Sequence, residues 1–433
     1  RTGSEILILV DGLRFAESRT SGSALVAPKF PLLQIARIEF IRGPGSAIYG
    51  SNAMMGVINI ISRSDVNQAN ISYGSLNKRR AHILTSNQLG GGTLDMLAYK
   101  ETDDGQAYWV ADTFSSNRVS TSDPREINAR LKWQDSWLNV QHHQYIGEDF
   151  YEFDEISNGH NRRSGGLTAI LFQQEIDWSF MTSQVFLSHS QSYYSTDVQL
   201  TAPGALASIS EPSSSDAFFA EVNFDDSKET RLALKTHWPM QANSSLQFGI
   251  SYGHIDIPQT TGKNNFDLRD LLKQNSSVRY YGELLATTPL QKKSKRDIVG
   301  AYAQYQQQIE DTHLTLGVRH DNFSNIGSQL SPRIGFVQEL NSHHSLKLLY
   351  GEAYRAPAEN ELNLLNNPIV LGNPDLKPET VQSADLIWIG QWKYTGTSLG
   401  YFESHFKRAI VQAINGATRR LENTKQGQVK DLN

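Results

Sequence analysis

Apolar and polar residues alternate along most of this chain, with the period of two that is typical of β-strands. The alternation is clear in Asn128–Gln134, Arg231–Trp238 and Thr312–His320. From residue 68 onward we count about 16 segments of this kind, a number typical of a large antiparallel sheet. A soluble β-sandwich and a membrane barrel share this pattern, because the polar face meets bulk water in one and the lumen in the other.

The first 65 residues have a different pattern. Short apolar runs at Glu5–Val10 and Val57–Ile61 predict buried strands, and Leu32–Ile41 predicts a helical turn leading into a third strand. Gly43-Pro44-Gly45 predicts a tight turn. A unit this small is not stable without something around it.

The lengths of the connections argue for a membrane barrel. Short links are predicted at Gly90–Gly92, Gln134–Ser136, Glu310–Asp311 and Asn341–Ser342. Long ones are predicted at 102–125, 146–165, 254–297 and 352–378. Compact soluble domains seldom hold several long loops, whereas outer-membrane barrels combine short periplasmic turns with long external loops. The alternation is irregular over 239–297, which predicts a strand there that the pattern does not resolve.

Aromatic residues mark the ends of many predicted strands. They are Tyr99, Trp137, Trp238, Tyr350, Trp388 and Trp392. This placement is typical of the interfacial girdles of membrane barrels, and aromatic residues scattered through a soluble core are the alternative.

Composition excludes several classes of protein. The chain has 433 residues, 39% of them hydrophobic, and a formal net charge of −5 without a basic cluster, which argues against nucleic-acid binding. There is no cysteine, so disulfides and thiolate chemistry are absent. No apolar run approaches the roughly 20 residues of a membrane-spanning helix. No signal segment opens the chain, and Arg1 precedes an apolar strand without an initiator Met, which predicts a fragment.

Two groups of residues carry a family resemblance. The first lies in the N-terminal unit and comprises Asp11, Gly12, Arg42, Gly43, Pro44, Tyr49, Gly50, Gly56 and Asn59. The second lies late in the chain and comprises Tyr354, Arg355, Pro357, Asn373, Pro374, Pro378 and Glu379. Between them, Ala303–Asp321 ends in Gly-x-Arg-x-Asp. In this order the motifs resemble those of TonB-dependent outer-membrane receptors.

The resemblance implies a mainly β fold, a transmembrane antiparallel β-barrel of the type with about 22 strands, incomplete here, with a partial plug domain in its lumen. Residues 1–65 would be the C-terminal part of the plug, and residues 66–433 the barrel, truncated before its last strands. The segment that contacts TonB would precede Arg1, and the closing strands would follow Asn433. An unclosed barrel exposes two sheet edges, so we expect the fragment not to fold or function well alone.

The function implied is TonB-dependent active transport across the outer membrane of a Gram-negative bacterium, most often of an iron–siderophore complex. The implied partners are the TonB complex, a small ligand such as a ferric siderophore and the lipid bilayer, with a monomeric receptor, no nucleic acid and no cofactor. Passive porin-like or adhesin-like barrels, and receptors for cobalamin, haem or another ligand, are the alternatives. No histidine lies between the two late motifs, which weakens the case for haem. No catalytic motif is present, so an enzyme is not expected.

Four features invite roles that the sequence leaves open. Arg42 is expected to pair with carboxylates of the barrel wall and anchor the plug, and Phe15–Lys29 is the candidate plug apex. The loop Ile146–Gly166 carries Glu148, Asp149, Glu152, Asp154 and Glu155, which a solvated loop explains better than a calcium site. The pairs His142-His143 and His343-His344 point to opposite faces of a strand, so no metal site is expected there. The ligand-binding residues remain unknown.

Overall fold

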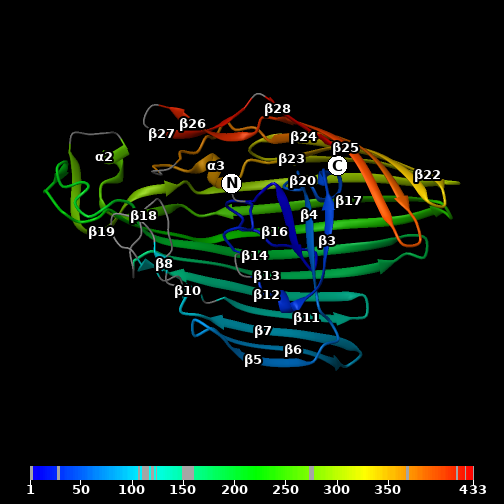
Figure 1. Ribbon diagram of the computed structural model, residues 1–433, viewed down its shortest axis with the longest axis horizontal. Coiled ribbons are helices and arrows are strands. Elements are labelled where there is room, and N and C mark those ends of the chain that lie inside the picture. Colours follow the sequence, from blue (N-terminus) through cyan, green and yellow to red (C-terminus); the bar gives the residue numbers. More distant parts are fainter. Residues whose placement is uncertain are drawn as a thin grey trace.

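A small N-terminal sheet packs inside a large curved one (Figure 1). The computed structural model describes residues 3–26, 30–105, 108–109, 117–118, 121–122, 124–148, 160–272, 277–366, 370–415, 418–424 and 426–432. The small sheet has the order β2-β1-β4-β3, with β1 and β4 parallel. We call this N-terminal unit the plug. Its elements are β1 (Ile6–Val10), β2 (Leu13–Arg14), η1 (Leu32–Gln34), β3 (Ile35–Arg42), α1 (Ser46–Tyr49) and β4 (Gly56–Ser62).

The large sheet, which we call the barrel wall, is a continuous antiparallel ladder. Its long strands are β5 (Gln68–Tyr73), β6 (Arg79–Leu89), β7 (Gly92–Thr102), β11 (Arg125–Trp133), β12 (Ser136–Glu148), β13 (Arg162–Asp177), β14 (Thr182–Gln199), β16 (Phe219–Gln241), β17 (Ser244–Ile257), β20 (Ser294–Ile309), β21 (Thr312–Phe323), β22 (Gly327–Asn341), β23 (His344–Arg355), β24 (Glu379–Gln391), β25 (Gly396–Lys407) and β28 (Gln426–Leu432). Each pairs with the next in that order, up to the β25–β28 pair. The described helices include none long and apolar enough to cross a membrane.

Shorter elements lie in the connections. They are β8 (Tyr108–Trp109), β9 (Asn117–Arg118), β10 (Thr121–Ser122), β15 (Ser210–Glu211), β18 (Thr260–Phe266), α2 (Leu268–Leu272), β19 (Val278–Gln291), α3 (Glu359–Asn363), β26 (Ile410–Asn415) and β27 (Thr418–Asn423). β18, α2 and β19 form a projection at one end of the wall, which we call the knob (Figure 1). The knob explains the irregular pattern over 239–297, because β17 pairs directly with β20 and the intervening strands extend beyond the wall.

The two faces of the barrel wall have opposite chemistry. In β21, Leu316 and Val318 are 42% and 43% exposed, whereas Arg319 is 8% exposed and faces the plug. Apolar residues are exposed in the same way on the outer face of strand after strand: Ile83, Ile127, Leu187, Leu232, Ile250, Val299, Leu348 and Leu386. The alternation predicted from the sequence therefore places apolar side chains on the outer, convex face and polar ones on the inner, concave face.

Turns and long connections separate at opposite ends of the wall, as predicted. The four short links join β6 to β7, β11 to β12, β20 to β21 and β22 to β23, all at the right-hand end in Figure 1. Among the aromatic residues expected in girdles, Trp137, Trp238 and Trp392 are exposed near short turns. Tyr99 is not: it is buried and donates a hydrogen bond to Glu101 at 2.9 Å, so its assignment to a girdle is wrong.

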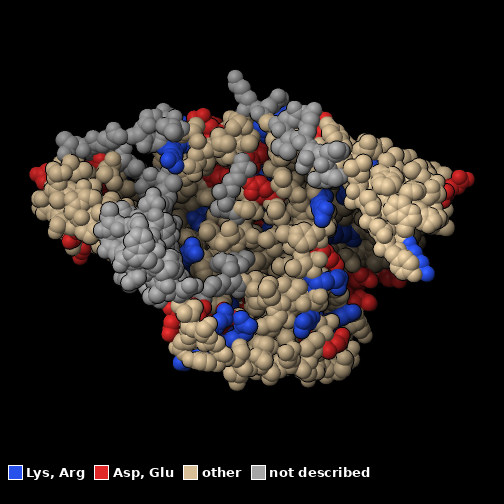
Figure 2. Space-filling model, viewed as in Figure 1, with Lys and Arg blue, Asp and Glu red and all other residues tan. Residues whose placement is uncertain are grey.

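The wall is an open barrel. No residue register joins β28 to β5 in the described part of the chain, and the two strands lie at opposite edges in Figure 1. Ile71 and Tyr73 of β5 are 88% and 75% exposed. Figure 2 shows Lys and Arg side chains gathered on the open side, around β3 and β4 of the plug.

The plug lies against the concave face of the wall. Val10, Leu13 and Phe15 pack on Leu167 and Leu171 of β13. Leu33 packs on β6 and β7, and Met54 packs on β23 and β24. The predicted boundary at residue 65 falls between β4 and β5, where the chain passes from one sheet to the other.

Candidate functional site

The two groups of motif residues, far apart in the sequence, meet where α1 docks on the end of β23. The Ser46 hydroxyl donates to the Tyr354 carbonyl at 3.4 Å and accepts from the Tyr354 N–H at 3.2 Å. The Asn52 N–H donates to the same carbonyl at 3.3 Å, and the Ala356 N–H donates to the Ser51 hydroxyl at 3.0 Å. We call these five residues the clasp. It joins the plug to the barrel wall through hydrogen bonds to backbone groups.

At two positions of the plug motif, Gly50 and Gly56, a larger residue would clash or be strained. Gly50 ends α1 with φ of +76°, and a Cβ there would lie 3.2 Å from the Arg319 guanidinium. Gly56 begins β4, where a Cβ would lie 2.6 Å from the Ile41 carbonyl oxygen, closer than real contacts allow. Both let the plug backbone approach its neighbours closely.

Arg319 and Asp321 form a buried ion pair beneath the clasp. Two nitrogens of Arg319 each lie 2.7 Å from an oxygen of Asp321, and the Tyr354 hydroxyl donates to Asp321 at 2.7 Å. Arg319 also donates to the Ile48 carbonyl of the plug at 3.3 Å. The sequence pattern assigned no role to the Gly-x-Arg-x-Asp motif. The structure shows that its arginine contacts the plug directly.

Arg14 occupies the plug side of the same pocket. It donates to the Ser51 carbonyl at 2.8 Å and to the Asn52 side chain at 3.3 Å. Burial, followed by the nearby positive charge of Arg231, lowers the pKa of Arg14 to about 10, so it stays protonated at neutral pH. Sequence reasoning missed Arg14. The available signal was its position two residues after the Asp11-Gly12 turn.

Arg42, which was expected to anchor the plug, does not do so in this structure. It is exposed on β3, and the described residues include no carboxylate paired with it. The remaining plug-motif residues stabilise the plug itself. Asp11 accepts from the Ser62 N–H at 2.8 Å, and Asn59 donates to Glu39 at 2.9 Å. Gly12 and Gly43 lie in turns, Tyr49 lies in α1, and Pro44 packs against Gly351 of β23.

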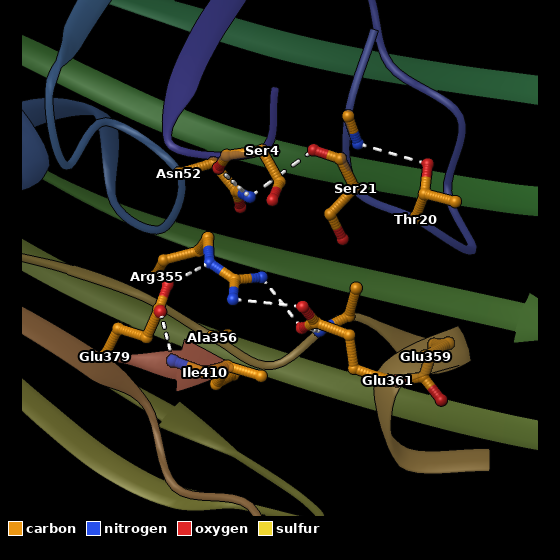
Figure 3. A network of polar contacts seen from close by, with 12 residues as sticks. Ser4, Thr20, Ser21, Asn52, Arg355, Ala356, Glu359, Glu361, Glu379 and Ile410 are labelled. Carbon is orange, nitrogen blue, oxygen red and sulfur yellow. Dashed lines mark hydrogen bonds and ion pairs between the residues drawn. The ribbon is translucent and has the colours of Figure 1, made fainter. Parts of the chain in front are cut away.

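Arg355 holds the loop that follows β23 (Figure 3). Its guanidinium donates to both carboxylate oxygens of Glu361, at 2.8 and 3.1 Å, and to Glu379 of β24. The Ala358 N–H also donates to Glu361 at 2.8 Å, and the Ile410 N–H donates to Glu379. Arg355 is only 2% exposed, so these partners are needed to compensate a buried charge.

The other late-motif residues surround the same loop. Pro357 and Pro378 are buried, and Pro374 is exposed. The Asn373 side chain donates to the Leu421 carbonyl at 2.9 Å and accepts from Arg420 at 3.2 Å. The structure therefore brings Tyr354, Arg355 and Glu379 together, with Asn373 at the edge of the group.

The loop after β23 also covers the predicted plug apex. The Asn360 N–H of α3 donates to the Arg19 carbonyl at 3.1 Å, and Glu359 pairs with Arg296 of β20 at 2.7 Å. Arg19 is 3% exposed and stacks on the Phe224 ring at 3.5 Å. In this structure the described part of the apex is thus largely covered by the wall and the loop.

Other candidates from the sequence have limited support. The acidic loop falls mostly outside the described residues, and Glu148 pairs with Arg162 at 3.5 Å. His143 bonds Glu126 at 2.6 Å, while its neighbour His142 bonds Thr168 at 2.8 Å on the other face. The described residues contain no group of three or more His, Cys, Asp or Glu side chains placed to hold a metal ion.

Family models match both units of the chain. A model described as TonB-dependent Receptor Plug Domain matches residues 1–57, and one described as TonB dependent receptor-like, beta-barrel matches residues 61–430.

Individual proteins are similar over most of the chain. The probable TonB-dependent siderophore receptor PirA of Acinetobacter baumannii is 27% identical, over 88% of this chain and 55% of its own length. The vitamin B12 transporter BtuB of Vibrio vulnificus is 22% identical, over 94% of this chain and 60% of its own length. The chain thus spans little more than half the length of these curated relatives.

Solved structures share the fold. The crystal structure of the siderophore receptor PirA from A. baumannii superposes with a TM-score of 0.70 and 19% identity, over 99% of this chain and 69% of that one. The ferric enterobactin receptor PfeA of Pseudomonas aeruginosa, in a complex with enterobactin, gives a TM-score of 0.70, 17% identity and coverage of 99% and 70%. The plug inside an apolar-faced barrel wall and the two family matches agree: this chain belongs to the TonB-dependent receptor family and contains both plug and barrel sequence.

Proposed function

We propose that this chain is the plug, residues 1–65, and most of the barrel, residues 66–433, of an outer-membrane transporter. It captures a scarce ligand and imports it with energy delivered by TonB. The observation that carries the proposal is the clasp: a plug held by hydrogen bonds inside a wall whose outer face is apolar. A barrel this wide leaks unless its lumen is blocked, and a blocked lumen needs energy input to open.

A ferric siderophore is the ligand class that we propose. The supporting observation is the similarity to PirA and PfeA, which are named as siderophore and ferric enterobactin receptors. The similarity to BtuB makes cobalamin an arm of the test, together with haem. A receptor of this kind acts as a monomer in the lipid bilayer.

Uptake by whole cells tests the proposal. The full-length receptor is produced in cells that lack their own receptors, and accumulation of labelled ferric siderophores, cobalamin and haem is measured with and without an uncoupler. We expect accumulation of a ferric siderophore that stops when the proton-motive force collapses. Accumulation that continues after uncoupling would indicate a passive porin-like barrel and would refute the energised mechanism.

A further inference from the structure

Three arginines from the plug and the barrel wall line one small cavity beneath the clasp. Arg14 comes from β2 of the plug, Arg231 from β16 and Arg319 from β21. Gly253 of β17 and Asp321 of β21 also line the cavity, and its volume is about 20 Å³. We call it the arginine cavity. Since a single water molecule needs about 10–15 Å³ on this measure, the cavity has room for one small group.

The protein's own carboxylates do not balance the positive charge around the arginine cavity. Arg319 pairs with Asp321 at 2.7 Å, and Arg231 pairs with Glu229. Arg14 donates only to neutral oxygens, and no carboxylate in the described part of the chain is paired with it. Three cations against two carboxylates leave a formal charge of +1.

A fourth cation adds to this excess. The Lys235 ammonium of β16 lies over the Phe186 ring, 4.3 Å from its centroid, and the charge that acts on it is the positive charge of Arg319. Arg14 is repelled in the same way by Arg231 and Arg319. Like charges repel more strongly in a partly buried site than in water. An anion among these groups would relieve the repulsion.

The arginine cavity also offers hydrogen-bond donors that the protein does not use. A guanidinium has five N–H donors. Arg14 uses two of them, for the Ser51 carbonyl and the Asn52 side chain, and Arg231 uses one for Glu229. The remaining donors of these two arginines meet no further protein acceptor among the described residues. Hydrogen bonds between a cationic donor and an anion are about twice as strong as neutral ones, so the free donors suit an anion.

The space in the cavity depends on a glycine. Gly253 is opposite Arg231 in the β16–β17 register. A Cβ on residue 253 would lie 3.7 Å from Arg231 Nη1 and 3.7 Å from the Ile298 Cβ, which are ordinary contacts. An alanine methyl therefore fits here without strain and takes up part of the cavity, while every charge around it stays in place.

We propose that the arginine cavity binds one small monovalent anion, such as chloride, between Arg14 of the plug and Arg231 and Arg319 of the wall. The anion accepts hydrogen bonds from both sides and cancels the excess charge, so it joins the plug to the wall. The small volume excludes large anions such as gluconate. Because the Arg231 side chain is 31% exposed, the ion exchanges with the solution in the lumen. The strength of plug docking then depends on which anion is present.

Anomalous scattering from bromide tests the site directly. Crystals of the full-length receptor are grown in bromide, which has the charge of chloride and nearly its size. We expect an anomalous peak between the three guanidinium groups, absent from Arg14→Gln and weaker in Gly253→Ala. Arg42→Gln, which removes an exposed plug arginine instead, should keep the full peak. A wild-type receptor without the peak, or a Gly253→Ala receptor with an undiminished one, would overturn the proposal.

Protease cleavage of the plug measures the effect of the anion on docking. The full-length receptor is digested in chloride and in gluconate at equal ionic strength, so that screening is the same. An anion at ten times its Kd strengthens docking about tenfold, so we expect cleavage to be about tenfold slower in chloride. The difference should disappear in Arg14→Gln and shrink in Gly253→Ala.

Arg42→Gln is the matched control for this measurement and should respond to chloride as the wild type does. Equal cleavage of the wild type in both salts would refute the bridging role of the anion. A chloride effect that Arg14→Gln retains in full would indicate a general effect of the salt and would also contradict the site. Neither measurement depends on what the receptor imports, so the anion site and the transport function are tested separately.

Discussion

Removing the clasp hydroxyls should loosen the plug without unfolding the barrel. In the Ser46→Ala/Ser51→Ala double variant, the N–H groups of Tyr354 and Ala356 lose their plug partners. Ser46 is 0% exposed, so the Tyr354 group cannot turn to water. The contacts of Asn52 and Arg319 with the plug and wall remain and keep the docking geometry.

The magnitude follows from the number of groups left without partners. A buried donor without an acceptor costs about 1–3 kcal/mol. Because Ser51 is only partly buried and both bonds meet one short stretch at the end of β23, we expect about 2–3 kcal/mol for the pair. Each 1.4 kcal/mol is a factor of ten, so the equilibrium for release of the plug should shift roughly 30- to 150-fold.

Single-channel recording of the full-length receptor in planar bilayers measures this shift. The double variant should show spontaneous openings over a fraction of time larger by that factor, whereas Ser328→Ala, an exposed serine on β22 outside the clasp, should match the wild type. The barrel of each variant is first shown to be folded by its heat-modifiable mobility. An open fraction within threefold of the wild type would refute the role assigned to the clasp.

Three further predictions concern single residues. Gly50→Ala places a Cβ at φ of +76° and 3.2 Å from the Arg319 guanidinium, so we expect a loss of about 1–3 kcal/mol in plug docking, measured by the protease susceptibility of the plug. Arg355→Met leaves two carboxylates without their cation, and since breaking a buried pair costs about 3–5 kcal/mol, amide hydrogen exchange in α3 should be much faster than in the wild type. Burial raises the pKa of Asp267, but hydrogen bonds from Arg269, Tyr281 and backbone N–H groups outweigh it and lower the pKa from 3.8 to about 2. That contribution to stability is present above pH 4 and is lost as the pH falls through 2, so hydrogen exchange at the start of α2 should accelerate only below about pH 4.

The strands of the barrel wall could be predicted from sequence because alternation and turn residues are visible within short segments. Alternation sets which side chains face outward, and turn residues such as Gly90 and Gly91 fix where each hairpin reverses. The knob was not resolved, because β18 pairs irregularly with β19 and its residues follow no period of two. Because its strands extend beyond the wall, their residues need not alternate between an apolar and a polar face.

The clasp could not be derived from sequence, although Tyr354 and the neighbours of its plug residues, Tyr49 and Gly50, were among the motif residues. Ser46 and Tyr354 are separated by 308 positions, and nothing in either segment specifies the other as its partner. Arg42 and Arg14 show the same limit. Each is the last residue of a plug strand, and only the docking of the plug decides which arginine is buried and which is exposed.

The central claim is a plug held inside a wall whose convex side meets lipid. Spin labels placed one at a time at positions 314–318 of the full-length receptor in bilayers test it most directly, through collision with oxygen and with a water-soluble nickel chelate. Positions 316 and 318 should be accessible to oxygen and protected from the chelate. Position 317 should be accessible to the chelate rather than to oxygen, or protected from both. Uniform access of the chelate along the strand would contradict the claim.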